Sequence, residues 1–215
     1  MRRVTATLLS VTAMLVAGCK STGVDQASSI GTRLREAANE LGEANSAIDD
    51  AVAALKMDAN GDLKAQYKNL TEKLDALESK AADIHDIRTN LRSKEDEYVA
   101  AWQERQATIT DPDLRKKSED RKNEFTKRFA GISGKADTTR ANYDTMIKQM
   151  RDVQRYLEHD LNAAGISATA DTAKSATKLS SDVKSGVYDI QTELKKIADD
   201  IDVPPPPPPP APAAK

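Results

Sequence analysis

Apolar residues recur at alternating steps of three and four along most of the chain, and this spacing constrains the fold more than any other feature. It is typical of helices that pack side by side along one apolar edge. Between residues 29 and 203 the chain is rich in Ala, Lys, Glu, Asp and Leu and poor in aromatic residues, as in long helices. We therefore predict an all-α fold. In the first helix the apolar positions are Ile30, Leu34, Ala37, Leu41, Ala44, Ile48, Ala51 and Leu55.

Three breaks in this pattern divide the chain into four predicted helices. Turn-forming residues occupy 57–62, and Asp111 and Pro112 follow the second apolar stretch. Asp111 can cap the next helix, and Pro112 can occupy its first turn. Gly165 is predicted as the residue that follows the end of the third helix. The helices are expected over 26–56, 62–109, 112–163 and 167–202.

These lengths predict an antiparallel four-helix bundle whose two long central helices extend as a coiled-coil hairpin. Central helices of about 50 residues would each be about 75 Å long, and the outer helices are shorter. We expect residues 90–128 to project beyond the outer helices, with the tip of the hairpin near 111–112. Charged residues at seam positions agree with a seam whose edges are exposed to water in this two-helix segment. They are Arg88, Glu95 and Arg105.

The N-terminal segment resembles a bacterial lipoprotein signal that ends at Cys19. Arg2 and Arg3 precede an apolar run over 4–16 that is too short to span a bilayer, and small residues stand directly before the cysteine. The resemblance implies cleavage after residue 18 and acylation of Cys19 with palmitate-like chains, which would anchor the protein to a membrane. We expect residues 1–18 to be the signal peptide and 19–28 a flexible tether. Lys20 at the second mature position favours the outer membrane, with the body facing the periplasm.

Charge and cysteine content exclude other classes of function. Removal of residues 1–18 takes two of 32 basic residues and none of the 34 acidic ones, which leaves a net charge near −4. Nucleic-acid binding needs a clustered basic excess, so no nucleic-acid partner is expected. Cys19 is the only cysteine, so acylation leaves none for a disulfide.

No catalytic, metal or cofactor motif is present in the sequence. His85 and His159 are the only histidines, and neither has a second histidine four residues away, as a helical metal site would need. We interpret both as surface or packing residues. No enzyme activity, cofactor or small-molecule substrate is predicted.

The C-terminal segment over 204–215 contains seven consecutive prolines and ends in Lys215. Consecutive prolines form a stiff polyproline II arm, here about 35 Å long. With Cys19 at one end and Lys215 at the other, the layout resembles the murein lipoprotein, and the resemblance implies that the Lys215 amine is joined to peptidoglycan. Two alternatives are non-covalent approach of the arm to the wall or a partner, and a tail that only keeps the chain in solution.

Scattered positions also resemble a family of bacterial lipoproteins catalogued as a domain of unknown function. The likeness covers about 25–195 and implies an all-helical fold and a lipid anchor without adding an activity. It rests on 61–63, Tyr67, Leu70, Trp102, Leu114, Arg115, Ser118, Arg121 and 156–163.

Together these features predict a structural outer-membrane lipoprotein with a single helical domain over 29–203. It would span from the membrane toward the cell wall or an envelope partner. The alternative is a helical adaptor whose hairpin tip, over 105–118 and next to Trp102, docks on an envelope protein complex. Trp102 is expected to fill a seam position in either case.

Overall fold

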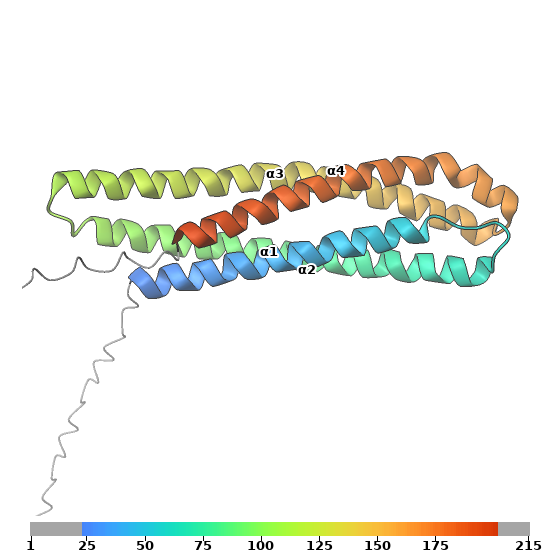
Figure 1. Cartoon of the computed structure of the whole chain (residues 1–215), viewed down its shortest axis with the longest axis horizontal. Helices are drawn as coiled ribbons and strands as arrows, with labels where there is room; N and C mark the ends of the chain where they lie inside the picture. Colours follow the sequence, from blue (N-terminus) through green and yellow to red (C-terminus); the bar gives the residue numbers. More distant parts are fainter. Residues whose placement is uncertain (1–22, 202–215) are drawn as a thin grey trace, which may run out of the picture.

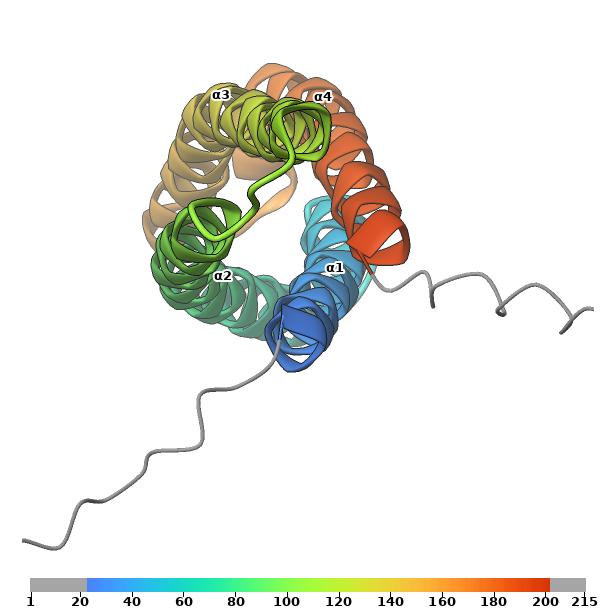
Figure 2. The same cartoon turned by 90° about the vertical axis from the view of Figure 1, so that its left-hand side faces the viewer.

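The protein is all-α and forms an elongated bundle (Figure 1). The structure, a computed structural model, describes residues 23–201, and within that range it contains four helices and no strand. Viewed end-on, the helices follow one another around a ring in chain order (Figure 2), and each packs against both of its neighbours. The prediction of an all-α fold with four helices is confirmed. The helices are α1 (Gly23–Ala54), α2 (Leu63–Gln106), α3 (Pro112–His159) and α4 (Ala163–Ile201).

Aspartate caps set the starts of the two long helices. The Asp62 side chain accepts a hydrogen bond from the Ala65 amide at 3.0 Å. The Asp111 side chain accepts bonds from the amides of Asp113 and Leu114, both at 2.9 Å, and Pro112 opens α3. These side chains satisfy amides that have no partner inside a helix, as the sequence predicted at Asp111 and Pro112.

The break between α3 and α4 lies earlier than predicted. α3 ends at His159, and Asn162 caps α4 by accepting bonds from the amides of Ala164 (2.8 Å) and Gly165 (3.0 Å). Gly165 is therefore a buried residue in the first turn of α4. The prediction that it follows the end of the third helix is wrong. A Cβ at this position would lie 1.9 Å from the Asp160 carbonyl oxygen, so glycine is needed for close backbone approach.

The first helix begins within the predicted tether. α1 starts at Gly23, so residues 23–28 are helical and only 19–22 of the proposed tether lie outside the described residues. Asp25 in the first turn favours the helix electrostatically, and Gln26 accepts a hydrogen bond from Arg105 of α2. This contact joins residues 79 positions apart, which local sequence cannot reveal.

Two apolar cores follow one another along the bundle. The first joins Leu70, Leu74 and Leu77 of α2 to buried residues of the other three helices. The second joins Phe125 and Phe129 of α3 to residues of α1 and α4. All predicted seam residues of the first helix are buried except Leu41, which is partly buried and packs against both cores.

The outer helices cover more of the central pair than predicted. Leu91, Tyr98 and Trp102 of α2 pack on the second core, and Arg128 of α3 binds Glu193 of α4 at 2.7 Å, so much of the range 90–128 is covered. The cause is the eight-residue linker 55–62, which displaces α1 along α2. Asp50 of α1 therefore binds Lys73 at 2.7 Å, and the first turn of α1 reaches Arg105.

Candidate functional site: a shared pole and an internal cavity

Both ends of the described chain lie at one end of the bundle (Figure 1). A Cβ on Gly23 would lie 3.4 Å from Nε of Arg105, near the end of α2, and Ile201 packs against the second core, as Trp102 does. The α2–α3 linker, residues 107–111, lies at this same end. We call this end the shared pole. The opposite end, with linkers 55–62 and 160–162, is the far pole.

The two strongest sequence-predicted sites, Cys19 and Lys215, lie outside the described residues. Cys19 precedes Gly23 by four residues, and a fully extended chain of that length spans at most about 14 Å. Lys215 follows Ile201 by fourteen residues.

The α2–α3 turn at the shared pole is held by its own side chains. The Arg115 guanidinium donates to the Ile109 carbonyl at 2.7 and 3.0 Å, and Gln106 donates to the Arg115 carbonyl at 3.3 Å. Leu114 lies one residue before Arg115 and is 56% exposed. Hydrogen bonds thus define the conformation of this turn, and an exposed apolar side chain lies beside it.

Trp102 belongs to an aromatic cluster behind this turn. Its ring lies 5.5 Å from Tyr98 and 6.4 Å from Phe125, and Phe125 lies 4.9 Å from Phe129. The indole nitrogen donates to the Ser118 hydroxyl at 2.8 Å. Trp102 therefore joins α2 to α3 and packs against the second core, in agreement with the seam position predicted for it.

The charged seam residues of α2 have specific environments. Arg88 binds Asp137 of α3 at 2.7 Å, and Arg105 donates to Gln26 of α1. Glu95 has no such role, and its pKa is raised above the ordinary value, first by burial and then by the nearby Asp96 carboxylate. Two of the three charges thus join α2 to neighbouring helices.

The two histidines lie on the surface. His85 is exposed on α2 and His159 is the last residue of α3, where a basic group favours the helix end. Between residues 23 and 201 no cluster of three or more His, Cys, Asp and Glu side chains is placed to hold a metal ion. None of these four helices has an apolar stretch long enough to cross a bilayer.

A cavity of about 470 Å³ lies between the two cores, a feature that the sequence did not predict. All four helices line it, with Ala37 and Ala44 on α1, Ala81 on α2 and Ala136 on α3. Its exposed lining residues belong to α2 and α3, so it opens between these helices. Those residues are Ala82, His85, Asp86, Arg140 and Asp144.

Small residues explain why the centre is not filled. Alanines at the seam positions leave space where leucine would meet the opposite helix. Gly186 brings α4 against α3, because a Cβ there would lie 2.2 Å from the Thr139 hydroxyl oxygen. α3 and α4 are thus drawn together on one side of the cavity, while near the middle of α2 Lys80 binds Glu40 at 3.1 Å and Glu43 at 2.8 Å on α1.

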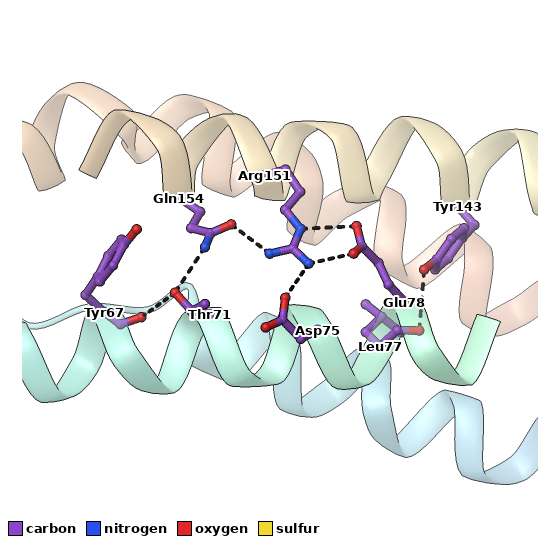
Figure 3. A network of polar contacts seen from close by, with 8 residues as sticks. All are labelled: Tyr67, Thr71, Asp75, Leu77, Glu78, Tyr143, Arg151 and Gln154. Carbon is purple, nitrogen blue, oxygen red and sulfur yellow. Dashed lines mark hydrogen bonds and ion pairs between the residues drawn. The ribbon is translucent and has the colours of Figure 1, made fainter. Parts of the chain in front are cut away.

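Polar bridges between α2 and α3 lie on either side of the cavity opening. On one side Arg88 binds Asp137, and on the other Arg151 binds Asp75 at 2.7 Å and Glu78 at 2.6 Å (Figure 3). Hydrogen bonds to Glu78 are the first cause that raises the pKa of Arg151, and the guanidinium stays charged.

The Arg151 network continues along the helices in Figure 3. Arg151 donates to Gln154 at 2.8 Å, and Gln154 donates to the Thr71 hydroxyl at 3.0 Å. Tyr143 lies next to the cavity and donates to the Leu77 carbonyl at 3.4 Å. Burial, followed by the charges of Glu78 and Asp144, raises the pKa of this tyrosine to about 12.

Comparison with known proteins gives one finding. A family model described as "Protein of unknown function (DUF2959)" matches residues 17–201. No curated protein and no solved structure matches the chain.

Proposed function

The chain belongs to the DUF2959 family, a family of unknown function, and from its own residues we propose that it is a structural lipoprotein of the outer membrane. In this proposal acyl chains on Cys19 hold it to the membrane, and the helical body faces the periplasm and extends toward the cell wall or an envelope partner. It acts by position and length, without catalysis.

The observation that carries the proposal is the place where α1 begins. Gly23 lies against Arg105 at the shared pole, and only four residues separate it from Cys19. An acylated Cys19 would therefore hold the shared pole at the membrane surface. A bundle that stands on this pole would place the far pole tens of ångströms from the membrane, because α3 alone is 48 residues and about 72 Å long.

We further propose that the bundle is antiparallel and that its α2–α3 pair ends in a short coiled-coil hairpin. Ion pairs support opposite directions, because Arg88 of α2 pairs with Asp137 of α3, whereas Asp75 pairs with Arg151. Buried residues of α3 begin only at Phe125, so the hairpin would comprise the end of α2 and residues 112–124.

Acylation is tested first, by growing cells with a labelled palmitate analogue and fractionating their membranes. We expect label on the full chain in the outer membrane, and no label when Cys19 is replaced by serine. A Lys20→Asp variant should keep the label and move to the inner membrane. Label that persists in the Cys19→Ser variant would overturn the proposed anchor.

Attachment to the wall through Lys215 is tested separately. Sacculi are boiled in detergent and digested with a muramidase, and the C-terminal peptide is examined by mass spectrometry. A muropeptide on the Lys215 amine would support a covalent tether, and Lys215→Arg should abolish it. If only the unmodified peptide is found, in the detergent-soluble fraction, the covalent tether is excluded.

The alternative function, an adaptor that docks through the hairpin tip, is favoured by one observation. Leu114 is 56% exposed in the first turn of α3, next to the linker that Arg115 binds at the Ile109 carbonyl. With the shared pole at the membrane, the partner of such an adaptor would lie at the membrane surface. If the protein is an adaptor, disruption of 105–118 should abolish its function. If it is a tether, deletion of 204–215 should abolish its function instead.

A further inference from the structure

The cavity between the two cores has the size and position of a ligand site. Its volume of about 470 Å³ lies within the range of small-molecule pockets, and it opens between α2 and α3. It extends from Ala37 to Ile48 on α1 and from Leu77 to Leu91 on α2. These stretches correspond to about 17 Å and 21 Å of helix, so the cavity is long and runs parallel to the bundle axis.

The lining indicates what such a ligand must be. The inner wall is aliphatic, with Val183, Val187, Ile190 and Leu194 contributed by α4. The hydroxyl of Thr139, the wall residue between α3 and α4, is already bonded to the Lys135 carbonyl at 2.9 Å. A ligand with polar groups along its length would find few partners inside, so its buried part must be apolar.

The exposed polar side chains of the lining stand at the opening. The other charged lining residues are already paired, Lys80 with Glu40 at 3.1 Å and Arg88 with Asp137 at 2.7 Å. His85 and Asp86 lie on the α2 edge, and Arg140 and Asp144 on the α3 edge. The ion pair between Arg140 and Asp144 is long, at 3.8 Å, and both side chains are more than half exposed. A polar group at one end of the ligand can remain there in water while the rest is inside.

We propose that this cavity binds a single long aliphatic chain, such as the acyl chain of a fatty acid, with its polar end at the α2–α3 opening. The length of the cavity along the helices and its aliphatic wall favour a linear chain over a compact ring system. The proposed ligand is a separate molecule, and the chain used in the test below lacks Cys19. The proposal does not depend on acylation of Cys19.

The test uses residues 20–215, since both cores and every wall of the cavity lie within 23–201. The probe is cis-parinaric acid, a polyene fatty acid whose fluorescence rises in apolar surroundings. We expect saturable binding, displacement by palmitate but not by butyrate, and a rise in melting temperature with palmitate.

A matched pair of variants on α3 locates the site. Ala136 lines the cavity and Ala141 is exposed five residues later, so the same substitution to phenylalanine can be made at both. Ala136→Phe should weaken probe binding at least about tenfold, whereas Ala141→Phe should change it less than about twofold. Ala81→Phe, from the opposite wall, is measured alongside and should act like Ala136→Phe.

Circular dichroism establishes that each variant is helical before binding is measured. Loss of binding in either folded cavity variant, with retention in Ala141→Phe, supports the site. Saturable binding that survives both cavity substitutions would overturn it. Absence of binding by the unchanged chain, together with a higher melting temperature for Ala136→Phe, would show an empty packing defect and overturn it as well.

Discussion

Glycines in α3 and α4 differ in what surrounds them, and their substitution should have opposite effects. Gly131 and Gly134 are exposed on α3, with no atom within 4 Å of an added Cβ and no positive φ. Gly165 and Gly186 instead allow close approach of Asp160 and Thr139. Each glycine therefore either weakens a helix or permits a contact.

We expect Gly131→Ala and Gly134→Ala each to stabilise the fold by about 0.5–1 kcal/mol, since alanine restricts the unfolded chain and favours helix. Gly186→Ala should destabilise it by about 1–3 kcal/mol, because the added methyl overlaps the Thr139 hydroxyl. Urea denaturation measures both effects. Thr139→Ala should restore much of the stability lost in the Gly186→Ala chain. If it does not, overlap with the Thr139 hydroxyl is not the cause of the destabilisation.

Tyr143 should make stability depend on pH in the alkaline range. Its pKa in the folded protein is about 12, above the ordinary value of 10.0, so the folded chain keeps a proton that the unfolded chain loses. The contribution of Tyr143 is therefore complete below pH 10 and is lost as the pH rises toward 12. The free energy of unfolding of Tyr143→Phe should fall less steeply over this window. Equal slopes for both chains would contradict the assignment.

At the scale of helices, polar bridges extend the contact between α2 and α3 beyond the core that they share. α2 contributes Leu70, Leu74 and Leu77 as its buried residues, all in its first half. Beyond them it is held by Arg88 and by the aromatic cluster around Trp102. The bridges thus determine how far apart α2 and α3 stand at the cavity.

Arg151 offers the clearest test of these bridges. Its side chain is 17% exposed and binds two carboxylates of α2, so Arg151→Ala should cost about 1–3 kcal/mol. Arg155 lies one turn later, is 69% exposed and pairs only with Asp152 of its own helix among the ion pairs described for residues 23–201. Arg155→Ala should change stability by less than about 0.5 kcal/mol in the same denaturation experiment. Equal losses would mean that the α2 carboxylates contribute little.

Local signals in the sequence were sufficient to predict the four helices, but not how far each helix is displaced along its neighbours. Apolar spacing and the Asp111–Pro112 start predicted four helices, because periodicity and capping act within a few residues. The α3–α4 break was misplaced because Gly165 resembles a helix-ending glycine, although Asn162 caps the next helix. The Gln26–Arg105 contact and the cavity arise only when distant helices come together.

At the scale of the whole molecule, the shared pole predicts an orientation on the membrane. Ala107 is exposed at this pole and Asn60 is exposed at the far pole, with the 44 residues of α2 between them. That helix is about 66 Å long. Acylated Cys19 would leave an introduced cysteine at either position as the only free thiol.

We expect a fluorophore on Ala107→Cys to be quenched by headgroup-labelled lipid in vesicles that carry the acylated protein. The same fluorophore on Asn60→Cys should keep its emission, because it would stand tens of ångströms from the surface. Detergent solubilisation, which removes the bilayer, should restore emission at Ala107→Cys. Stronger quenching at Asn60→Cys would show that the bundle is inverted or lies flat.

The neighbouring start of α1 and end of α4 also determine how the bundle responds to mechanical force. Tension applied between Gly23 and Ile201 pulls two packed helices apart at their common end, so their contacts break one turn after another, as a zipper opens. A bundle loaded at opposite ends would instead have to shear many contacts at once. Fully extended, residues 23–201 would reach about 600 Å. In the proposed role as a connection between two surfaces, such a bundle would unfold and lengthen at low force when the distance between the surfaces increases.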